Sequence, residues 1–364
     1  MDKFLPSQKP PKNLGVEKIP QFVTIGFDDN ERSGFTPQKG TEGVKWAVDT
    51  FANRKNPDGA NCSCAFYFTS SYITDDAVEP PHLVKKSWKY AFDKGCEIGC
   101  HTHSHPDGSK FSVEEWLSEI NRCIDDLTKP YKDGDDGENS GIGVSREKIF
   151  AFRTPYLSYN ANTLKAVEKT GFVYDCSLEE GFQDEQDGKN FYFPYTLDEG
   201  SPGNKFTHLQ NPEIEEIGCH AGIWEVPAHA VIVPPDDLCE KYGIAKGLRK
   251  KCARLQSYFN EDDGKITGLD YNCLVEFQMS GEEFLATLKY TLDLRLAGNR
   301  APFVFGGHTG IYSQEYDSEP PIKISEKERQ KVIEDFLDYA LAKGEVFVVS
   351  PIKIIEWMRN PKEL

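Results

Sequence analysis

The sequence lacks an apolar run long enough to cross a membrane. The stretch at residues 230–233 ends at Pro234, far short of the roughly 20 residues that a membrane helix needs. Basic residues are also few, because 42 lysines and arginines stand against 59 aspartates and glutamates, a formal net charge of −17. So acidic a surface repels nucleic acids and anionic lipids at long range. We therefore expect no nucleic-acid and no membrane partner, while a neutral or cationic ligand is easier to accommodate.

Cysteine is plentiful, but no Cys-x-x-Cys pair occurs among the ten, which disfavours a zinc ribbon. An even count fits either reduced thiols or disulfides in an oxidising compartment. We favour disulfides and expect most of the ten to be paired, which predicts a secreted, extracellular protein. Met1-Asp2-Lys3 leads into Pro-rich sequence instead of an apolar segment. A removed secretion signal would explain this start, and a cytosolic origin is the alternative.

Short apolar runs alternate with amphipathic helical patterns along most of the chain. Ser112 and Glu115 form a capping box before one helical face. The alternation predicts an α/β fold with a parallel sheet, open or closed into a barrel. The expected strands are residues 22–27, 65–68, 97–100, 149–152, 172–174, 303–305 and 346–348, and the expected helices are residues 42–52, 83–93, 113–127, 162–169 and 281–297 and one that starts after Ser325.

Two segments break this alternation. Residues 132–143 are rich in Gly, Asp and Asn and are expected to form a surface loop, whereas residues 179–273 are long, aromatic and weakly periodic. We interpret the second segment as an insertion within a single domain of residues 21–364, preceded by an N-terminal extension of residues 1–20. Disulfides among four cysteines would fasten the insertion: Cys219, Cys239, Cys252 and Cys273.

Three histidines cluster at His101, His103 and His105, directly after the expected strand 97–100. Neutral imidazole is the commonest metal ligand in proteins. If the backbone coils here, His101 and His105 share a face, whereas an extended backbone would pair His101 with His103. The cluster therefore indicates a metal site without fixing its two ligands.

Three more polar groups follow expected strands. Asp28 and Asp29 follow the strand 22–27, where one carboxylate can bind a metal and the other can accept a proton. Arg153 can hold a carboxylate, and the Tyr156 N–H can serve as an oxyanion donor. His308 follows two glycines, which let the backbone and a substrate approach closely. Carboxyl ends of parallel strands meet in one crevice, so we expect these groups to lie together.

These motifs resemble those of the polysaccharide deacetylases, carbohydrate esterase family four. Gly26-Phe27-Asp28-Asp29-Asn30 is similar to the family's Thr-Phe-Asp-Asp-Gly motif, and His101-Thr102-His103-Ser104-His105 fits its His-[Ser/Thr]-x-x-His motif. Arg153-Thr154-Pro155-Tyr156 and Phe305-Gly306-Gly307-His308 fit two further motifs. The resemblance runs from about Val23 to Pro361 and is strongest to the chitin deacetylase-like proteins of insects, as segments such as Asn56-Pro57-Asp58-Gly59 and Asn299-Arg300-Ala301-Pro302-Phe303 indicate.

The resemblance implies a distorted (β/α) barrel of the NodB-like type and a zinc site formed by Asp29, His101 and His105. Other divalent transition metals also fit such ligands. It further implies that Asp28 is the general base and His308 the general acid. The remaining implied roles are orientation of Asp28 by Arg153, oxyanion and substrate binding by Tyr156, lining of the acetyl pocket by Trp224, and tethering of Arg153 or His308 by Asp175.

The implied activity is metal-dependent removal of acetyl groups from N-acetylglucosamine units of chitin or another such glycan, by a monomer. An acetylxylan esterase or a peptidoglycan deacetylase is the alternative among enzymes, and an inactive glycan-binding protein is the alternative without catalysis.

Three departures from the motifs stand out. Asn30 replaces glycine but tolerates positive φ, Phe305 conserves the apolar character of a leucine, and Gly26 in place of threonine has no explanation in the sequence.

Overall fold

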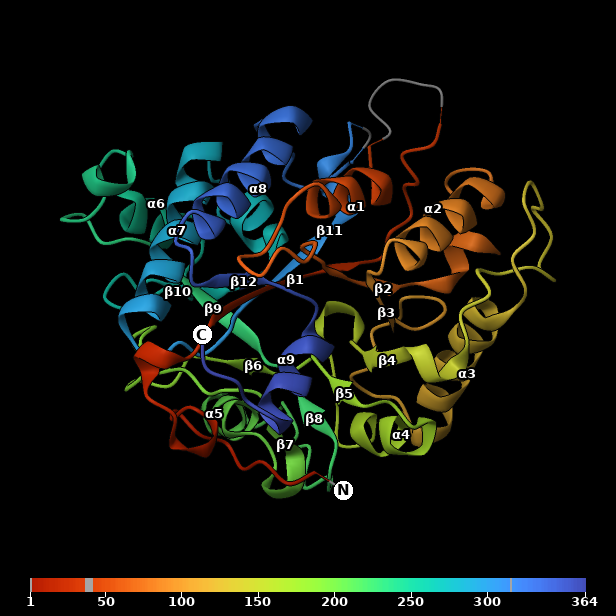
Figure 1. The fold of residues 1–364 in the computed structure, drawn as a ribbon, viewed down its shortest axis with the longest axis horizontal. Coiled ribbons are helices and arrows are strands. Elements are labelled where there is room, and N and C mark those ends of the chain that lie inside the picture. The colour runs from red at the N-terminus through yellow and green to blue at the C-terminus, as the bar shows by residue number, and fades with distance from the viewer. Residues whose placement is uncertain (1, 37–41, 315) are drawn as a thin grey trace.

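A curled, mainly parallel β-sheet forms the centre of the protein (Figure 1). The computed structural model describes residues 2–36, 42–314 and 316–364. Within the sheet the order is β11-β1-β2-β3-β4-β5-β8-β7, with β12 beside the start of β1, and only β7 runs antiparallel to its neighbour. These strands are β1 (Gln21–Asp28), β2 (Ala65–Phe68), β3 (Glu97–Cys100), β4 (Ile149–Phe152), β5 (Tyr174–Asp175), β7 (Tyr195–Thr196), β8 (Trp224–Glu225), β11 (Phe303–His308) and β12 (Val346–Val348).

Helices surround the central strands (Figure 1). Helices α1 to α4 alternate with strands β1 to β5 along the chain, as in parallel α/β folds. No helix of the described residues combines the length and apolar character needed to cross a membrane. The helices are α1 (Val44–Ala52), α2 (Pro81–Asp93), α3 (Val113–Thr128), α4 (Thr163–Thr170), α5 (Pro202–Gln210), α6 (Leu248–Leu255), α7 (Gly281–Ala297), α8 (Glu326–Leu341) and α9 (Pro351–Arg359).

A second, smaller sheet lies beside β11. It contains β6 (Glu179–Glu180), β9 (Ala228–Ile232) and β10 (Lys265–Thr267), in the order β10-β9-β6. A parallel bridge between Leu269 and Gly306 links the chain after β10 to β11. The predicted α/β barrel is thus confirmed as a curled half-barrel of parallel strands.

Several elements match the predicted bounds from end to end, among them β2, β3, β4, β12 and α7. The predicted capping box is present, since the Ser112 side chain accepts the Glu115 N–H and the Glu115 carboxylate accepts the Ser112 N–H. Helix α9 and the elements within residues 179–273 were not predicted, because their segments are short and weakly periodic. Two of those elements, β7 and β8, belong to the central sheet.

The N-terminal segment packs along the body of the domain. The ring of Phe4 lies 4.7 Å from that of Trp224, and Asn299 donates a hydrogen bond to the Gln8 carbonyl at 2.8 Å. Met1, the start of the predicted extension, lies outside the described residues. The division into extension, domain and insertion stays a prediction.

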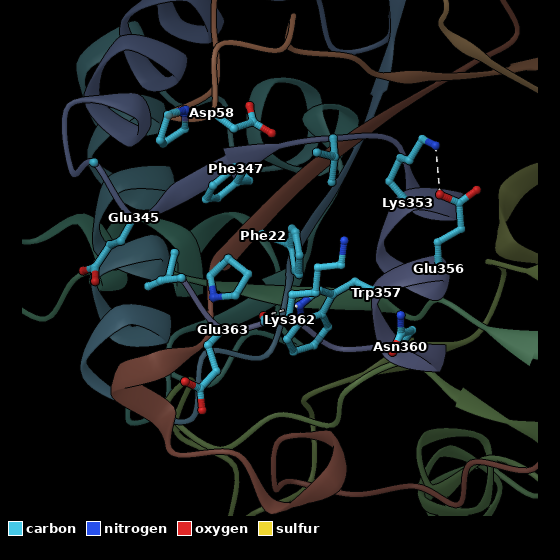
Figure 2. Close-up of a pocket in the computed structure, with 15 residues that line it drawn as sticks. Phe22, Asp58, Glu345, Phe347, Lys353, Glu356, Trp357, Asn360, Lys362 and Glu363 are labelled. Carbon is cyan, nitrogen blue, oxygen red and sulfur yellow. Dashed lines mark hydrogen bonds and ion pairs between the residues drawn. The ribbon is translucent and has the colours of Figure 1, made fainter.

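A groove of about 940 Å³ opens at the amino ends of β1 and β12 (Figure 2). Phe22, Phe347 and Trp357 form its apolar floor, and the Phe22 and Trp357 rings meet edge to face at 5.2 Å. An ion pair between Lys353 and Glu356 borders it. None of the predicted site residues lines this groove, which lies at the strand ends opposite to Asp28.

The predicted disulfides are absent, because all ten cysteines carry free thiols. Nine of them are buried and only Cys219 is exposed. The sulfur atoms of Cys64 and Cys96 lie 3.9 Å apart. Buried thiols pack as small apolar groups, so an even count of cysteines reflects core packing here and not pairing. Without disulfides, the cysteine count no longer indicates an oxidising compartment, and secretion stays a prediction.

Thiol titration checks this correction. We expect one fast-reacting thiol in the native protein, Cys219, and ten in denaturant without reductant. Burial raises the pKa of Cys62 to about 11 and that of Cys176 to about 12, so these thiols stay protonated and unreactive while the fold is intact. A Cys219→Ser variant is the matched control and should lose only the fast phase. Fewer than ten thiols in denaturant would restore the disulfide prediction.

Candidate metal centre and active site

The four predicted polar groups meet at the carboxyl ends of β1, β3, β4 and β11. They surround a pocket of about 400 Å³. This convergence follows from the parallel register, in which Asp28 on β1 pairs with His308 on β11. The pocket is lined by Asp28, Asp29, His101, His105, Thr154, Tyr156, Leu157, Leu269, Tyr271, Asn272, Glu276, His308 and Tyr316.

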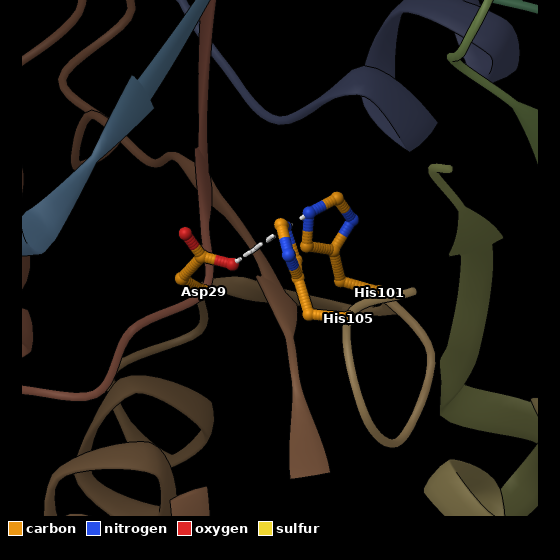
Figure 3. A group of neighbouring side chains, drawn as sticks. All are labelled: Asp29, His101 and His105. Carbon is orange, nitrogen blue, oxygen red and sulfur yellow. Dashed lines mark ion pairs between the residues drawn. The ribbon is translucent and has the colours of Figure 1, made fainter. Parts of the chain in front are cut away.

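Asp29, His101 and His105 form a group whose donor atoms all lie within 4.8 Å of one another. Figure 3 shows both imidazoles facing the Asp29 carboxylate. The Nε2 atom of His105 lies 3.2 Å from Asp29 Oδ1, and that of His101 lies 3.8 Å from the same oxygen. One carboxylate and two imidazoles are a ligand set typical of catalytic zinc sites that keep a position open.

The protonation states of these side chains suit a metal. Burial lowers the pKa of His101 to about 4, so its imidazole is neutral. Its Nδ1 lies 2.9 Å from the Arg153 carbonyl, which fixes that nitrogen as the donor and leaves Nε2 as a ligand atom. Burial acts to raise the pKa of Asp29, but His105, His101 and His308 outweigh it and lower that pKa. The three residues therefore fit a divalent cation.

The loop that carries both histidines coils tightly, with Thr102 at φ 68° and His105 at φ 54°. This coiling turns His103 away from the triad, with Nδ1 2.8 Å from Ser70 Oγ. A Glu119 carboxylate on α3 accepts the N–H groups of His103 and Ser104 at 3.0 and 2.8 Å and fixes the loop. Of the two pairings that the sequence leaves open, the structure brings His101 and His105 together.

Asp28 forms a buried ion pair with Arg153, at 2.9 Å between Asp28 Oδ1 and Arg153 Nη1. Burial acts to lower the pKa of Arg153, but the Asp28 carboxylate raises it well above its ordinary value, so the guanidinium stays charged. Arg153 Nε also donates to the Cys176 carbonyl at 3.1 Å. The carboxylate of Asp28 is therefore held in place and is not part of the metal triad.

Tyr67 explains the glycine at position 26. The Arg153 guanidinium lies over the Tyr67 ring, 4.3 Å from its centroid. This ring fills the space between Gly26 and Gly99, where an added Cβ would approach it to 2.5 Å on either side. A threonine at position 26 would collide with the ring, so the departure from the family motif makes room for the side chain that supports Arg153.

His308 is held by Asp270, a residue that the sequence did not reveal. Asp270 is fully buried and lies 2.7 Å from His308 Nδ1, and it accepts the His308 N–H at 2.8 Å. Burial acts to lower the pKa of His308, but Asp270 outweighs it and raises the pKa to about 10. The imidazole is therefore protonated at neutral pH.

The two glycines before His308 serve the approach of this partner segment. A Cβ at Gly306 would lie 2.1 Å from Leu269, and one at Gly307 would lie 3.3 Å from an Asp270 oxygen. The two glycines therefore make room for the chain segment that follows β10, whereas the sequence suggested that they make room for a substrate.

Tyr156 stands at the mouth of the pocket with 70% of its surface exposed. Its ring meets that of His105 edge to face at 4.5 Å. The backbone is left-handed here, at φ 58°, and follows Pro155, which fixes the entry to the turn. Its N–H donates no hydrogen bond to any residue that the structure describes. That N–H is therefore free for a ligand, as the predicted oxyanion role requires.

The comparison with family models finds a match over the first part of the chain. Residues 17–174 match the polysaccharide deacetylase family. This segment of the chain is therefore similar to polysaccharide deacetylases. The matched segment includes Asp28, Asp29, His101, His105, Arg153 and Tyr156, and it ends before Asp270 and His308.

Two curated relatives from Bombyx mori align with nearly the whole chain at low identity. Chitin deacetylase 1 is 22% identical over 364 residues, which cover 97% of this chain and 53% of that protein. Chitin deacetylase 8 is 21% identical over 358 residues, covering 96% of this chain and 74% of that protein. The chain thus spans about half the length of chitin deacetylase 1.

A solved structure from Mycobacterium smegmatis, also described as a polysaccharide deacetylase, is similar in fold. It superposes with a TM-score of 0.50 and 15% identity, and the alignment covers 98% of this chain and 95% of the other. The two proteins therefore share the curled half-barrel fold.

Two roles implied for residues outside the pocket are wrong. Trp224 is fully buried in β8, where its ring packs on Phe4 and its Nε1 donates to the Asp2 carboxylate at 2.8 Å, so it does not line the acetyl pocket. Asp175 accepts hydrogen bonds from Ser177 and makes none to Arg153 or His308. Tyr271, Asn272 and Glu276 line the pocket instead, from a segment whose weak periodicity hid them.

Proposed function

We propose that this chain is a metal-dependent deacetylase that removes acetyl groups from N-acetylglucosamine units of chitin or its oligomers. The observation that carries the proposal is the meeting of three groups in one pocket: the Asp29, His101 and His105 triad, the Asp28–Arg153 ion pair and the Asp270–His308 pair. The family match over residues 17–174 supports deacetylation, and the two relatives named chitin deacetylases favour chitin.

Asp29, His101 and His105 would hold the metal, with zinc the preferred ion for this ligand set. A divalent metal in such a site supplies Lewis acidity, which polarises an acyl oxygen and lowers the pKa of water. The neutral imidazole of His101 and the lowered pKa of Asp29 leave both residues in the form that binds a cation at neutral pH.

The other pocket residues would move protons and stabilise charge. Asp28, kept in place by Arg153, accepts a proton from the water that attacks the acetyl carbonyl. The Tyr156 N–H donates to the oxygen that becomes negative as the tetrahedral centre forms. His308 enters the reaction protonated and donates to the amide nitrogen as its bond to the acyl carbon breaks. The products are acetate and a glucosamine unit.

An Asp270→Asn variant tests the role of His308 through pH. A general acid must be protonated, so kcat/KM falls as pH rises through the pKa of His308, which is raised to about 10. Losing the Asp270 charge removes the main stabilisation of the imidazolium, so the alkaline limb of the pH profile should move to lower pH. Asp262→Asn, on an exposed turn, is the matched control. An unmoved limb would show that another group donates the proton.

Acetate release from three substrates tests the proposed function. The purified protein loaded with zinc is incubated with chitin oligomers, acetylxylan and peptidoglycan, and acetate is quantified. We expect the largest kcat/KM for chitin oligomers. Faster release from acetylxylan or peptidoglycan would assign the alternative substrate. Binding of chitin oligomers without acetate release from any of the three would indicate a glycan-binding protein.

A further inference from the structure

Three carboxylates line the pocket, and two of them have cationic or metal-binding partners. Asp28 pairs with Arg153, and Asp29 faces the two histidines of the triad. The third, Glu276, forms no ion pair with any residue of 2–36, 42–314 or 316–364. Its charge therefore faces the pocket without compensation.

Two neutral donors fix the position of the Glu276 carboxylate. The Tyr258 hydroxyl donates to Oε2 at 2.7 Å, and the Asn272 amide donates to the same oxygen at 2.6 Å. Burial, followed by the neighbouring Glu276, raises the pKa of Tyr258, so its hydroxyl keeps the proton that it donates. The second oxygen, Oε1, accepts no hydrogen bond from the part of the chain that the structure describes. Glu276 thus presents one oriented, free acceptor.

Aromatic side chains flank this acceptor. Tyr271, which lines the same pocket, is 37% exposed, and Tyr258 is 62% exposed beside Glu276. Amphipathic tyrosine rings offer an apolar face together with a polar end, which suits the C–H faces of a sugar. The surroundings of Glu276 therefore fit a cationic sugar better than a metal, because the only metal-ligand group found among the described residues is the triad itself.

We propose that Glu276 binds the ammonium group of a glucosamine unit next to the N-acetylglucosamine unit in the pocket. This inference rests on the proposed deacetylase function and adds a preference for chains that are already partly deacetylated. An ammonium donor to a carboxylate makes a charge-assisted hydrogen bond, roughly twice as strong as the neutral bond from a hydroxyl or an acetamide N–H. The product of one turnover then becomes a ligand for the next, and acetyl groups are removed from neighbouring units.

The kinetic test uses two tetrasaccharides, one fully acetylated and one with a single acetylated unit among glucosamine units. The readout is the ratio of kcat/KM for the second substrate to that for the first. In the wild-type protein this ratio should exceed one, and Glu276→Gln should lower it about fivefold to tenfold, as expected when a charge-assisted bond becomes a neutral one. Glu138→Gln, in an exposed loop, removes the same charge elsewhere and should leave the ratio unchanged.

A binding test needs no turnover. Calorimetry of the fully deacetylated glucosamine tetramer should give a weaker affinity for Glu276→Gln than for the wild type. In the wild type, raising the ionic strength should weaken this affinity more than that of the acetylated tetramer. The measurement at raised ionic strength shows whether an ionic contact contributes to binding, and the comparison with Glu276→Gln assigns that contact to Glu276.

The outcomes separate the two proposals. The role of Glu276 is overturned if the kinetic ratio is unchanged in Glu276→Gln. It is also overturned if the affinity for the glucosamine tetramer changes neither with salt nor with the substitution. Absence of acetate release by the wild-type protein from every glycan overturns the proposed function instead, and the calorimetric arms still report whether Glu276 binds an ammonium group.

Discussion

Replacing Asp28 by asparagine is expected to slow acetate release by about 10²–10⁴-fold, the usual cost of losing a general base, while the metal stays bound. Asp28 lies outside the group of metal-ligating atoms and is held by Arg153. Asparagine has the same shape and can still accept the Arg153 hydrogen bond, but it cannot take a proton from water. Turnover of chitin oligomers and elemental analysis of the same preparation measure the two effects separately.

The neighbouring carboxylate provides the control. Asp29→Asn should lose metal affinity, because Asp29 supplies the oxygen closest to both imidazoles, and excess zinc should restore part of its activity. If Asp28→Asn is the variant that loses zinc, the roles of the two aspartates are exchanged. If it turns over at close to the wild-type rate, the hydrolytic step has another proton acceptor.

Replacing His101 by alanine is expected to remove most of the metal and, with it, the activity. The loss of affinity should exceed the roughly 10–100-fold that loss of a supporting hydrogen bond costs, because one of three protein ligands disappears. His82→Ala is the matched control, since His82 is a partly exposed histidine on α2 that pairs with Asp136. Zinc content after dialysis, measured for both variants, gives the answer. Full occupancy in His101→Ala would place the metal elsewhere.

The sequence predicted those parts of the site that directly follow apolar strands. Asp28 and Asp29 lie where β1 ends, and His101 comes immediately after β3, so the alternation of apolar and polar runs was enough to place them. The coiled loop that selects His105 over His103 depends on Glu119 from α3, a tertiary contact that spacing does not contain. The family resemblance supplied this information.

Asp270 and Glu276 were missed for a different reason. Asp270 and His308 are 38 positions apart in the sequence, and a β-bridge between Leu269 and Gly306 brings them together. Local sequence patterns do not encode such a contact. Trp224 shows the opposite error, because its pocket role came from the family resemblance, and a tryptophan is equally consistent with the wall of a pocket and with a fully buried strand. Only the packing of Phe4 against it decides between the two.

The Tyr67 ring between two glycines limits which substitutions this protein can tolerate. A side chain at position 26 requires a smaller residue at position 67, yet truncating Tyr67 alone would remove the surface on which Arg153 rests. Neither single replacement is neutral, so substitutions at the two positions should show strong epistasis. Threonine at position 26 should therefore be accommodated only when position 67 changes at the same time.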